Sequence, residues 1–239
     1  MLLSILTNVA IAAEEAAPGF TMAEIWDHSG GIARTVIVML IVMMLASIIV
    51  SLERAWMFRK AKEESIALVG SIVEPLQAGD IAASLALCNA EEHSNSYIAT
   101  LLRAGLKELG ERADEHGVAN ASRALDKTLN EEVGKLKKGM TILATTGSTA
   151  PFVGLFGTTF GVINAFQGMA TGGGGLAGIS AGISEALITT GVGIGVAVIG
   201  VWFFNYFNHR IEKITEELES SKVDLIDWAQ KAVIAKSGK

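Results

Sequence analysis

The sequence predicts an all-α membrane protein with three transmembrane helices and long cytoplasmic helical extensions. Half of the 239 residues are hydrophobic and only 18% are charged, whereas charged residues make up about a quarter of an ordinary globular chain. Two long stretches, residues 35–52 and 139–208, carry almost no charge. Elsewhere apolar residues recur at spacings of three and four, which is typical of helices. With a net charge of −6, this composition disfavours a disordered chain, a collagen and a nucleic-acid-binding protein.

The first membrane helix is predicted over residues 32–53. Its central 18 residues, 35–52, contain no charge. As a helix they rise about 27 Å, which nearly fills a hydrocarbon core of about 30 Å. Arg34 precedes this stretch, and Arg54 and Trp56 follow it. Arginine and tryptophan at such positions anchor a helix at the membrane surface.

Residues 139–208 are predicted to cross the membrane twice. They contain no Lys, Arg, Asp or His, and one carboxylate, Glu185. A single straight helix of this length would measure about 105 Å, so the chain must turn back, and the central glycine cluster favours a turn there. We predict membrane helices over residues 139–166 and 179–207, joined by a glycine-rich periplasmic loop over residues 167–178.

The distribution of basic residues predicts the orientation. Of the 19 Lys and Arg residues, 12 lie between residues 54 and 138, 6 follow residue 208, and only Arg34 precedes the first span. The positive-inside rule therefore places a helical domain of residues 54–138 and a C-terminal helix of residues 208–239 in the cytoplasm. The N-terminal segment, residues 1–31, is then periplasmic. Its start resembles a signal peptide without the usual basic region, and the alternative is a short apolar lead-in to the membrane.

The two cytoplasmic segments are predicted to be helical throughout. Their apolar residues follow helical spacing, and no strand-like alternation interrupts them. Asp80 is expected to cap a helix at its N-terminus, and Pro75 and Gly110 are expected to mark breaks.

The sequence predicts no enzyme site, no cofactor and no metal centre. The single cysteine, Cys88, excludes a disulfide within the chain. Neither Cys88 nor His93 and His116 has metal-ligand spacing, so surface or packing roles are expected for all three. The glycine run 172–175 lacks the Lys-Ser or Lys-Thr that follows a phosphate-binding loop.

Glu185 is the strongest candidate for a functional residue. A charged side chain in the middle of a membrane helix costs about 2.5 to 3.5 kcal/mol on insertion scales. A carboxyl group placed there binds and releases protons, as a proton relay requires. The alternative is that Glu185 lies at the helix start next to the glycine loop, where water and the helix dipole stabilise its charge.

Small and hydroxyl-bearing residues accompany Glu185 in the predicted second and third spans. Thr189 follows Glu185 by four residues and shares its helix face. A stripe of small residues permits close helix approach, and threonine hydroxyls contribute to a hydrated path, with packing alone as the alternative for the glycines. Pro151 is expected to bend the second span. The candidate ion-pathway residues are Glu185, Thr158, Thr190 and Thr189, and the candidate helix-packing residues are Gly154, Gly157, Gly161 and Pro151.

Two motifs in these spans resemble a known family. Residues 149–166 read TAPFVGLFGTTFGVINAF, and residues 181–198 read AGISEALITTGVGIGVAV. Together they resemble the MotA/TolQ/ExbB proton-channel family, and three spans fit its ExbB/TolQ branch, since MotA has four. By this resemblance Glu185 corresponds to the family's glutamate in GIAEAL, Thr158 to its threonine in GLFGT, and Thr190 to the threonine five residues after the glutamate.

The resemblance implies a bacterial inner-membrane protein that forms a homopentameric ring around a dimer of a single-span ExbD- or TolR-like partner. The complex would conduct protons and use the ion-motive force to drive a TonB- or TolA-like protein in periplasm-spanning transport or envelope work. It implies no cofactor other than the translocated ion, H+. Stepwise rotation of two helices inside a five-fold ring is a hypothesis. Ion-driven work that survives cross-linking of the partner to this chain would contradict it.

Departures from the family pattern keep alternatives open. Thr189 stands where the family often has alanine, and GISAG replaces the frequent APG, so a gliding-motility-type motor of the same family is one alternative. The nearby hydroxyl oxygens also leave sodium open as the translocated ion. A non-conducting membrane scaffold assembled through small residues is the second class of function. A transporter with its own substrate site is disfavoured, because the spans hold a single carboxylate and no visible inverted repeat.

Overall fold

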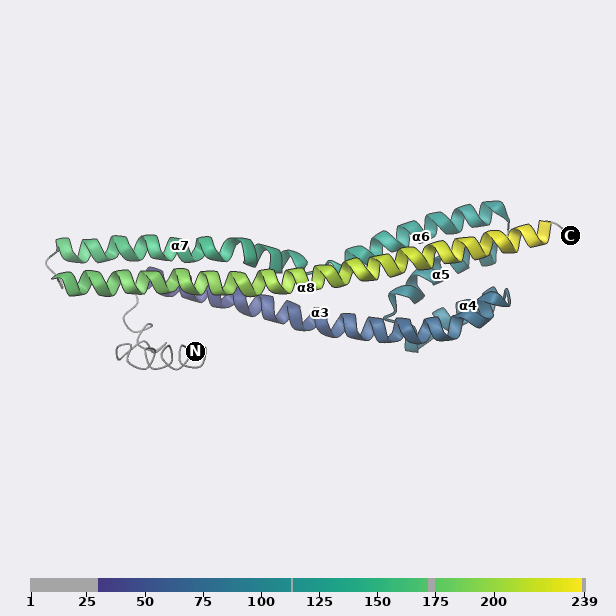
Figure 1. The fold of residues 1–239 in the computed structure, drawn as a ribbon, viewed down its shortest axis with the longest axis horizontal. Helices are drawn as coiled ribbons and strands as arrows, with labels where there is room; N and C mark the ends of the chain where they lie inside the picture. The colour runs from purple at the N-terminus through teal and green to yellow at the C-terminus, as the bar shows by residue number, and fades with distance from the viewer. Residues whose placement is uncertain (1–29, 113, 172–174, 238–239) are drawn as a thin grey trace, which may run out of the picture. The chain divides into compact units, whose positions relative to one another are not determined.

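The computed structural model describes residues 30–112, 114–171 and 175–237, and in these ranges the chain forms helices without strands (Figure 1). The helices are α3 (Gly31–Gln77), α4 (Ile81–Cys88), the short 3-10 helix η1 (Glu91–His93), α5 (Tyr97–Glu111), α6 (Glu115–Leu136), α7 (Met140–Ala170) and α8 (Gly175–Ser237). This confirms the predicted all-α class. The start that resembles a signal peptide lies outside the described residues.

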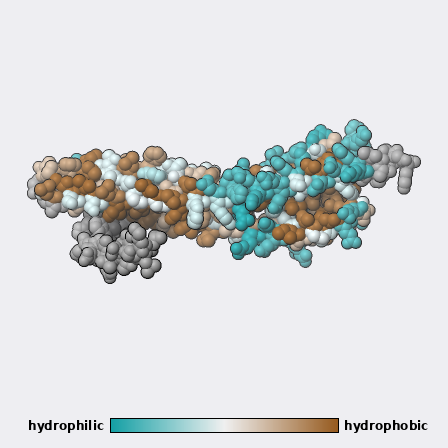
Figure 2. Space-filling view, viewed as in Figure 1, coloured by the Kyte–Doolittle hydropathy of each residue, from teal (hydrophilic) through white to brown (hydrophobic). Residues whose placement is uncertain are grey.

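Among the residues that the structure describes, three helices are long and apolar enough to cross a membrane, the number that the sequence predicts. They are α3, α7 and the part of α8 from Gly178 to Lys231. Hydrophobic side chains cover the outside of α7 and of the first part of α8 (Figure 2). Phe152 on α7 is 70% exposed and Leu187 on α8 is 60% exposed. These exposed apolar side chains suit contact with lipid or with other membrane helices.

The chain folds as two units. Of the described residues, the first unit comprises those in 30–41 and 150–195, and the second comprises those in 42–149 and 196–237. Helices α3, α7 and α8 each contribute to both units. The predicted ion-pathway residues all belong to the first unit, and α4, α5 and α6 belong to the second.

The second unit has a hydrophobic core that joins α3, α5, α6 and α8. Leu68 of α3, Leu101 and Leu106 of α5, Leu125 of α6 and Leu218 of α8 are all fully buried. On α8 the buried residues Phe207, Ile211, Ile214 and Leu218 recur at spacings of four, three and four and so share one face, which packs into this interior.

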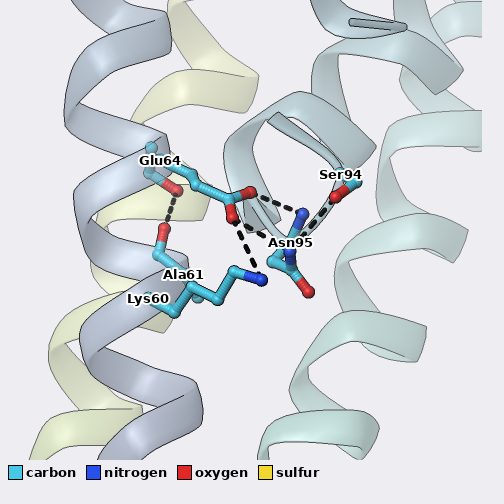
Figure 3. A network of polar contacts seen from close by, with 6 residues as sticks. Lys60, Ala61, Glu64, Ser94 and Asn95 are labelled. Atoms are coloured by element: carbon cyan, nitrogen blue, oxygen red, sulfur yellow. Dashed lines mark hydrogen bonds and ion pairs between the residues drawn. The ribbon is translucent and has the colours of Figure 1, made fainter. Parts of the chain in front are cut away.

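A polar network fixes the start of α5 against α3 (Figure 3). The carboxylate of Glu64 accepts hydrogen bonds from the backbone N–H of Asn95 at 2.7 Å and from its Nδ2 at 2.9 Å. The Oγ of Ser96 lies 2.9 Å from the Oγ of Ser65 and accepts a hydrogen bond from the N–H of Ala99 at 3.0 Å. Ser96 therefore caps α5 and also ties it to α3.

The predicted helix signals between α3 and α5 fall close to the observed boundaries. The side chain of Asp80 accepts a hydrogen bond from the N–H of Ala83 at 2.9 Å, which confirms the predicted N-cap of α4. Helix α3 continues two residues past Pro75, and α5 continues one residue past Gly110.

The predicted glycine-rich loop of residues 167–178 is helical at both ends in the structure. Helix α7 continues to Ala170, and α8 begins at Gly175. Glycine adopts helical angles as well as the left-handed region, and Gly175 has a φ of +50°. A glycine-rich sequence therefore permits a turn without fixing how far the flanking helices extend.

Candidate ion-pathway site

In the first unit α7 and α8 approach each other closely because glycine occupies contact positions on α7. A methyl group on Gly154 would lie 2.7 Å from the carbonyl oxygen of Thr189, and one on Gly161 would lie 2.7 Å from the Cβ of Ala186. Both distances are below 3.0 Å, which real Cβ atoms essentially never show. A larger side chain at either position would push the helices apart. Pro151 lies inside α7, half-buried and three residues before Gly154.

Thr189 is fully buried in this helix contact. Its Oγ1 lies 2.7 Å from the carbonyl oxygen of Ala186 and 3.2 Å from that of Gly154. A methyl group on Gly157 would lie 2.6 Å from the same hydroxyl oxygen. The structure therefore places Thr189, which we predicted for the ion pathway, where it packs against α7 and hydrogen-bonds to backbone.

Thr158 and Thr190, which we name the hydroxyl pair, form a polar contact between α7 and α8. Their Oγ1 atoms are hydrogen-bonded to each other. The Oγ1 of Thr158 also lies 3.2 Å from the carbonyl oxygens of Gly154 and Ala186. A hydroxyl group has one proton to donate and two lone pairs. Both hydroxyls are satisfied when Thr158 donates to a carbonyl and accepts from Thr190.

Glu185 lies on α8, directly before Ala186. Its Oε1 accepts a hydrogen bond of 2.9 Å from the N–H of Gly30, the residue that precedes α3. A methyl group on Gly30 would lie 3.8 Å from the Nδ2 of Asn164, so α7 places an amide in the same neighbourhood. Our sequence analysis did not identify Gly30 or Asn164. The contribution of Gly30 is a backbone N–H, which a pattern of side chains does not predict. Asn164, in contrast, could have been identified from the sequence, because it is a polar amide inside an apolar span.

The first unit thus holds the hydroxyl pair between α7 and α8 and, on α8, the carboxylate of Glu185 hydrogen-bonded at the start of α3. Carboxyl and hydroxyl groups donate and accept protons, and they do so without a bound cofactor. In the described ranges no group of three or more His, Cys, Asp or Glu side chains is placed to hold a metal ion. The arrangement is therefore chemically suited to handling a proton.

Cys88 and His93 have packing positions in the second unit. Both are buried, and Cys88 is completely inaccessible. Burial raises the pKa of the Cys88 thiol to about 11, so the thiol is protonated at neutral pH. Arg103 donates a hydrogen bond to the backbone carbonyl of Cys88.

A model of the MotA/TolQ/ExbB proton channel family matches residues 93–220, which is more than half of the chain. The chain belongs to this family. The matched range contains Thr158, Glu185, Thr189 and Thr190, so the whole candidate site on α7 and α8 lies inside the region shared by the family. It is a family of channels, not of enzymes, in keeping with a sequence in which we predicted no enzyme site.

Named relatives agree with the ExbB/TolQ branch of the MotA/TolQ/ExbB family. The chain is 38% identical over 127 residues to the Tol-Pal system protein TolQ of Pseudomonas aeruginosa, covering 50% of this chain and 55% of that protein. It is 39% identical over 107 residues to the biopolymer transport protein ExbB of Xanthomonas campestris, covering 44% and 42%. It is 32% identical over 117 residues to TolQ of Haemophilus influenzae, covering 47% and 50%. The chain thus spans about half the length of these relatives.

Proposed function

We propose that this chain is the ExbB- or TolQ-like subunit of an ion-motive-force-driven motor in the bacterial inner membrane. In this proposal it forms a homopentamer around a dimer of a single-span ExbD- or TolR-like partner. The complex conducts protons, and the proton flow drives a TonB- or TolA-like protein that acts across the periplasm. The N-terminus of each subunit faces the periplasm and the C-terminus faces the cytoplasm.

The hydroxyl pair between α7 and α8, in the same unit as Glu185, is the observation that carries the proposal. The carbonyl of Ala186, which follows Glu185 directly, lies 3.2 Å from the Oγ1 of Thr158, and that hydroxyl contacts Thr190. An intramembrane carboxylate is costly, and Glu185 is engaged by a hydrogen-bond donor. A carboxyl group and nearby hydroxyls supply the kinds of group that pass a proton between water and a partner's carboxylate.

The exposed apolar surface of the first unit supports assembly into a larger complex. Phe152 and Phe156 on α7 and Leu187 on α8 are each more than half exposed. Membrane helices bury such faces against lipid or against other helices. A ring of copies around a partner helix would cover the faces that do not contact lipid.

Glu185→Gln tests the proposal, because glutamine preserves the size of the side chain and removes its exchangeable acid proton. We expect the variant to assemble with the single-span partner in a pull-down and to lose ion-driven activity in cells. Glu216→Gln, which neutralises an exposed carboxylate of α8 in the second unit, is the matched control and should retain activity. If Glu185→Gln assembles and remains active, Glu185 is not part of the ion pathway and a non-conducting scaffold describes the protein better.

The translocated ion and the driven system need their own measurements. Proton conduction predicts activity that a protonophore abolishes and that does not depend on sodium. Activity that requires sodium would instead indicate that the threonine oxygens coordinate sodium as the translocated ion. Deletion of the chain in its host distinguishes the branch, by loss of TonB-type uptake, of envelope integrity or of gliding.

A further inference from the structure

A groove lies between α3 and α8 in the second unit. Its volume is about 280 Å³, and it runs along residues 55–66 of α3 and 206–217 of α8. Phe58, Phe207 and Ile214 are buried and form its apolar floor. The rings of Phe58 and Phe207 pack edge to face with their centroids 5.8 Å apart. The floor is therefore a packed part of the α3–α8 contact.

Four basic side chains line this groove, which we name the juxtamembrane groove. Arg59 and Lys62 lie three residues apart on α3, and Arg210 and Lys213 lie three residues apart on α8. Residues three apart share a helix face, so each helix presents two positive charges to the groove. All four side chains belong to exposed residues.

Most of this positive charge is not neutralised by neighbouring carboxylates. Among the residues that the structure describes, Arg59, Lys62 and Lys213 form no ion pair, whereas Lys60, Lys127, Lys135 and Lys222 each do. The guanidinium of Arg210 lies 5.6 Å from the ring centroid of Tyr206, and its Nη2 donates a hydrogen bond of 3.3 Å to the phenol oxygen. These cations remain available to an external anion.

Two carboxylates also line the groove, so its charge is mixed but positive. Glu217 already accepts a hydrogen bond of 2.5 Å from the hydroxyl of Tyr97. Glu63 is exposed and lies on the wall formed by α3. The groove therefore carries four basic groups and two acidic ones. One of the acidic groups, Glu217, is hydrogen-bonded to Tyr97.

The groove begins where the apolar stretches of α3 and α8 end. Charges first reappear after residue 52 on α3 and after residue 208 on α8. Trp56, Trp202 and Tyr206 flank these ends and are 68%, 77% and 54% exposed. Tryptophan and tyrosine concentrate at the membrane–water boundary, where lipid phosphates lie. The groove is thus at the level of the lipid headgroups.

We infer that the juxtamembrane groove binds the phosphate headgroup of an anionic phospholipid. Guanidinium and ammonium groups are the side-chain groups that bind phosphate in proteins. The apolar floor next to them suits the glycerol and the first methylenes of a lipid. A free phosphate ion would make no use of that floor or of the exposed aromatic residues. The charges and the position of the groove therefore favour a lipid over a soluble anion.

The test compares the lipid that remains bound to purified variants of the full chain in its assembled complex. Each complex is reconstituted into vesicles of phosphatidylethanolamine and phosphatidylglycerol, extracted into detergent and analysed by native mass spectrometry. For Arg59→Gln/Lys213→Gln we expect about tenfold less retained phosphatidylglycerol, since both side chains line the groove and a basic group beside an anionic headgroup adds to the attraction. Retained phosphatidylethanolamine should not change.

A matched control removes the same amount of charge outside the groove. Lys137→Gln/Lys138→Gln neutralises two residues that lie between α6 and α7 and do not line the groove, and it should retain phosphatidylglycerol as the unchanged chain does. Glu63→Gln removes the free carboxylate of the groove wall and should raise retention by up to about fivefold. Because Glu63 is exposed, an increase in retained phosphatidylglycerol for Glu63→Gln cannot be explained by a loss of folding.

Three outcomes would overturn the inference. Equal losses in the groove and control variants would mean that only general surface attraction acts. A change in the oligomeric mass of the groove variant, with unchanged helix content, would mean that a second copy of the chain covers this face. Binding of inorganic phosphate to the detergent-solubilised complex, with the same dependence on Arg59 and Lys213, would identify a free anion as the ligand.

Discussion

At the scale of single residues, two adjacent threonines of α8 have different surroundings. The hydroxyl of Thr189 lies between the carbonyls of Gly154 and Ala186 and is fully buried. The hydroxyl of Thr190 meets that of Thr158, and both residues remain partly exposed. Successive residues of a helix are rotated by about 100°. Thr189 therefore points into the helix contact, whereas Thr190 lies at its edge. We therefore expect the hydroxyl pair to be the more sensitive to changes that affect ion flow.

If the hydroxyl pair takes part in the proposed proton pathway, Thr158→Val should reduce ion-driven activity by about tenfold or more, because it removes one of the two hydroxyls while keeping nearly the same side-chain size. Thr159→Val is the matched control. The hydroxyl of Thr159 is exposed and reaches only the carbonyl of Leu155 one turn back in α7. Activity is measured in cells at equal amounts of assembled complex. Equal activity of the two variants would assign Thr158 to packing.

Cys88 should react slowly with a thiol reagent in the folded chain. Burial raises its pKa from 9.0 to about 11, so near pH 8 its thiolate fraction is about 100-fold below that of an unperturbed thiol, before steric protection is counted. The folded chain should start to react appreciably only as the pH approaches 11, whereas the denatured chain should do so near pH 9. Because Cys88 is the single cysteine, mass spectrometry of the whole chain reports its alkylation directly. Rapid labelling of the native chain at pH 8 would contradict its buried position.

At the scale of helices, the α7–α8 pair is held together by glycines that face each other. Methyl groups on Gly154 and Gly193 would each lie 2.7 Å from a backbone carbonyl of the opposite helix. Dispersion contacts and hydroxyl–carbonyl hydrogen bonds, both short-ranged, hold membrane helices in such a contact. The same close approach brings Thr158 within reach of α8, so helix packing and the polar contact depend on each other.

Gly154→Ala should weaken the α7–α8 contact by about 1 to 3 kcal/mol, since the added methyl group meets backbone that cannot move freely. Gly191→Ala is the matched control, because a methyl group on Gly191 would have no neighbour within 4 Å. Alanine favours a helix over glycine, so the control should be neutral or slightly stabilising. Thermal unfolding of the detergent-solubilised complexes measures the difference. A Gly154→Ala complex as stable as the control would show that the helices tolerate a wider spacing.

The elements of this protein were predictable to different degrees. Long uncharged stretches predict membrane helices directly, because hydrocarbon excludes both charges and unpaired backbone groups. Asp80 was identifiable as a cap because capping depends on residues close in the sequence. The contact between Glu185 and Gly30 joins positions 155 residues apart through a backbone N–H, and no local pattern encodes it. The true length of the turn after α7 was hidden for a similar reason, since glycine permits both helix and turn.

At the scale of the whole molecule, the uneven distribution of basic residues along the chain predicts the orientation in the membrane. Twelve basic residues lie between residues 54 and 138, against one before the first span. Polar and charged residues of the second unit require water, and the uncharged stretches of α3, α7 and α8 require lipid. Three spans and this bias together predict a single orientation for every subunit, which a symmetric ring also requires.

The orientation predicts which engineered cysteines an impermeant reagent reaches from the periplasm. In a Cys88→Ala background, Thr171→Cys places a thiol at the turn after α7, and Ser220→Cys places one on the charged part of α8. Both positions are exposed. A membrane-impermeant maleimide should label Thr171→Cys in intact spheroplasts and Ser220→Cys only after the membrane is permeabilised, because the positive-inside rule predicts that the basic segments 54–138 and 208–239 face the cytoplasm. The reverse pattern would invert the topology, and labelling of both positions in intact spheroplasts would mean that the turn and the charged part of α8 lie on the same side.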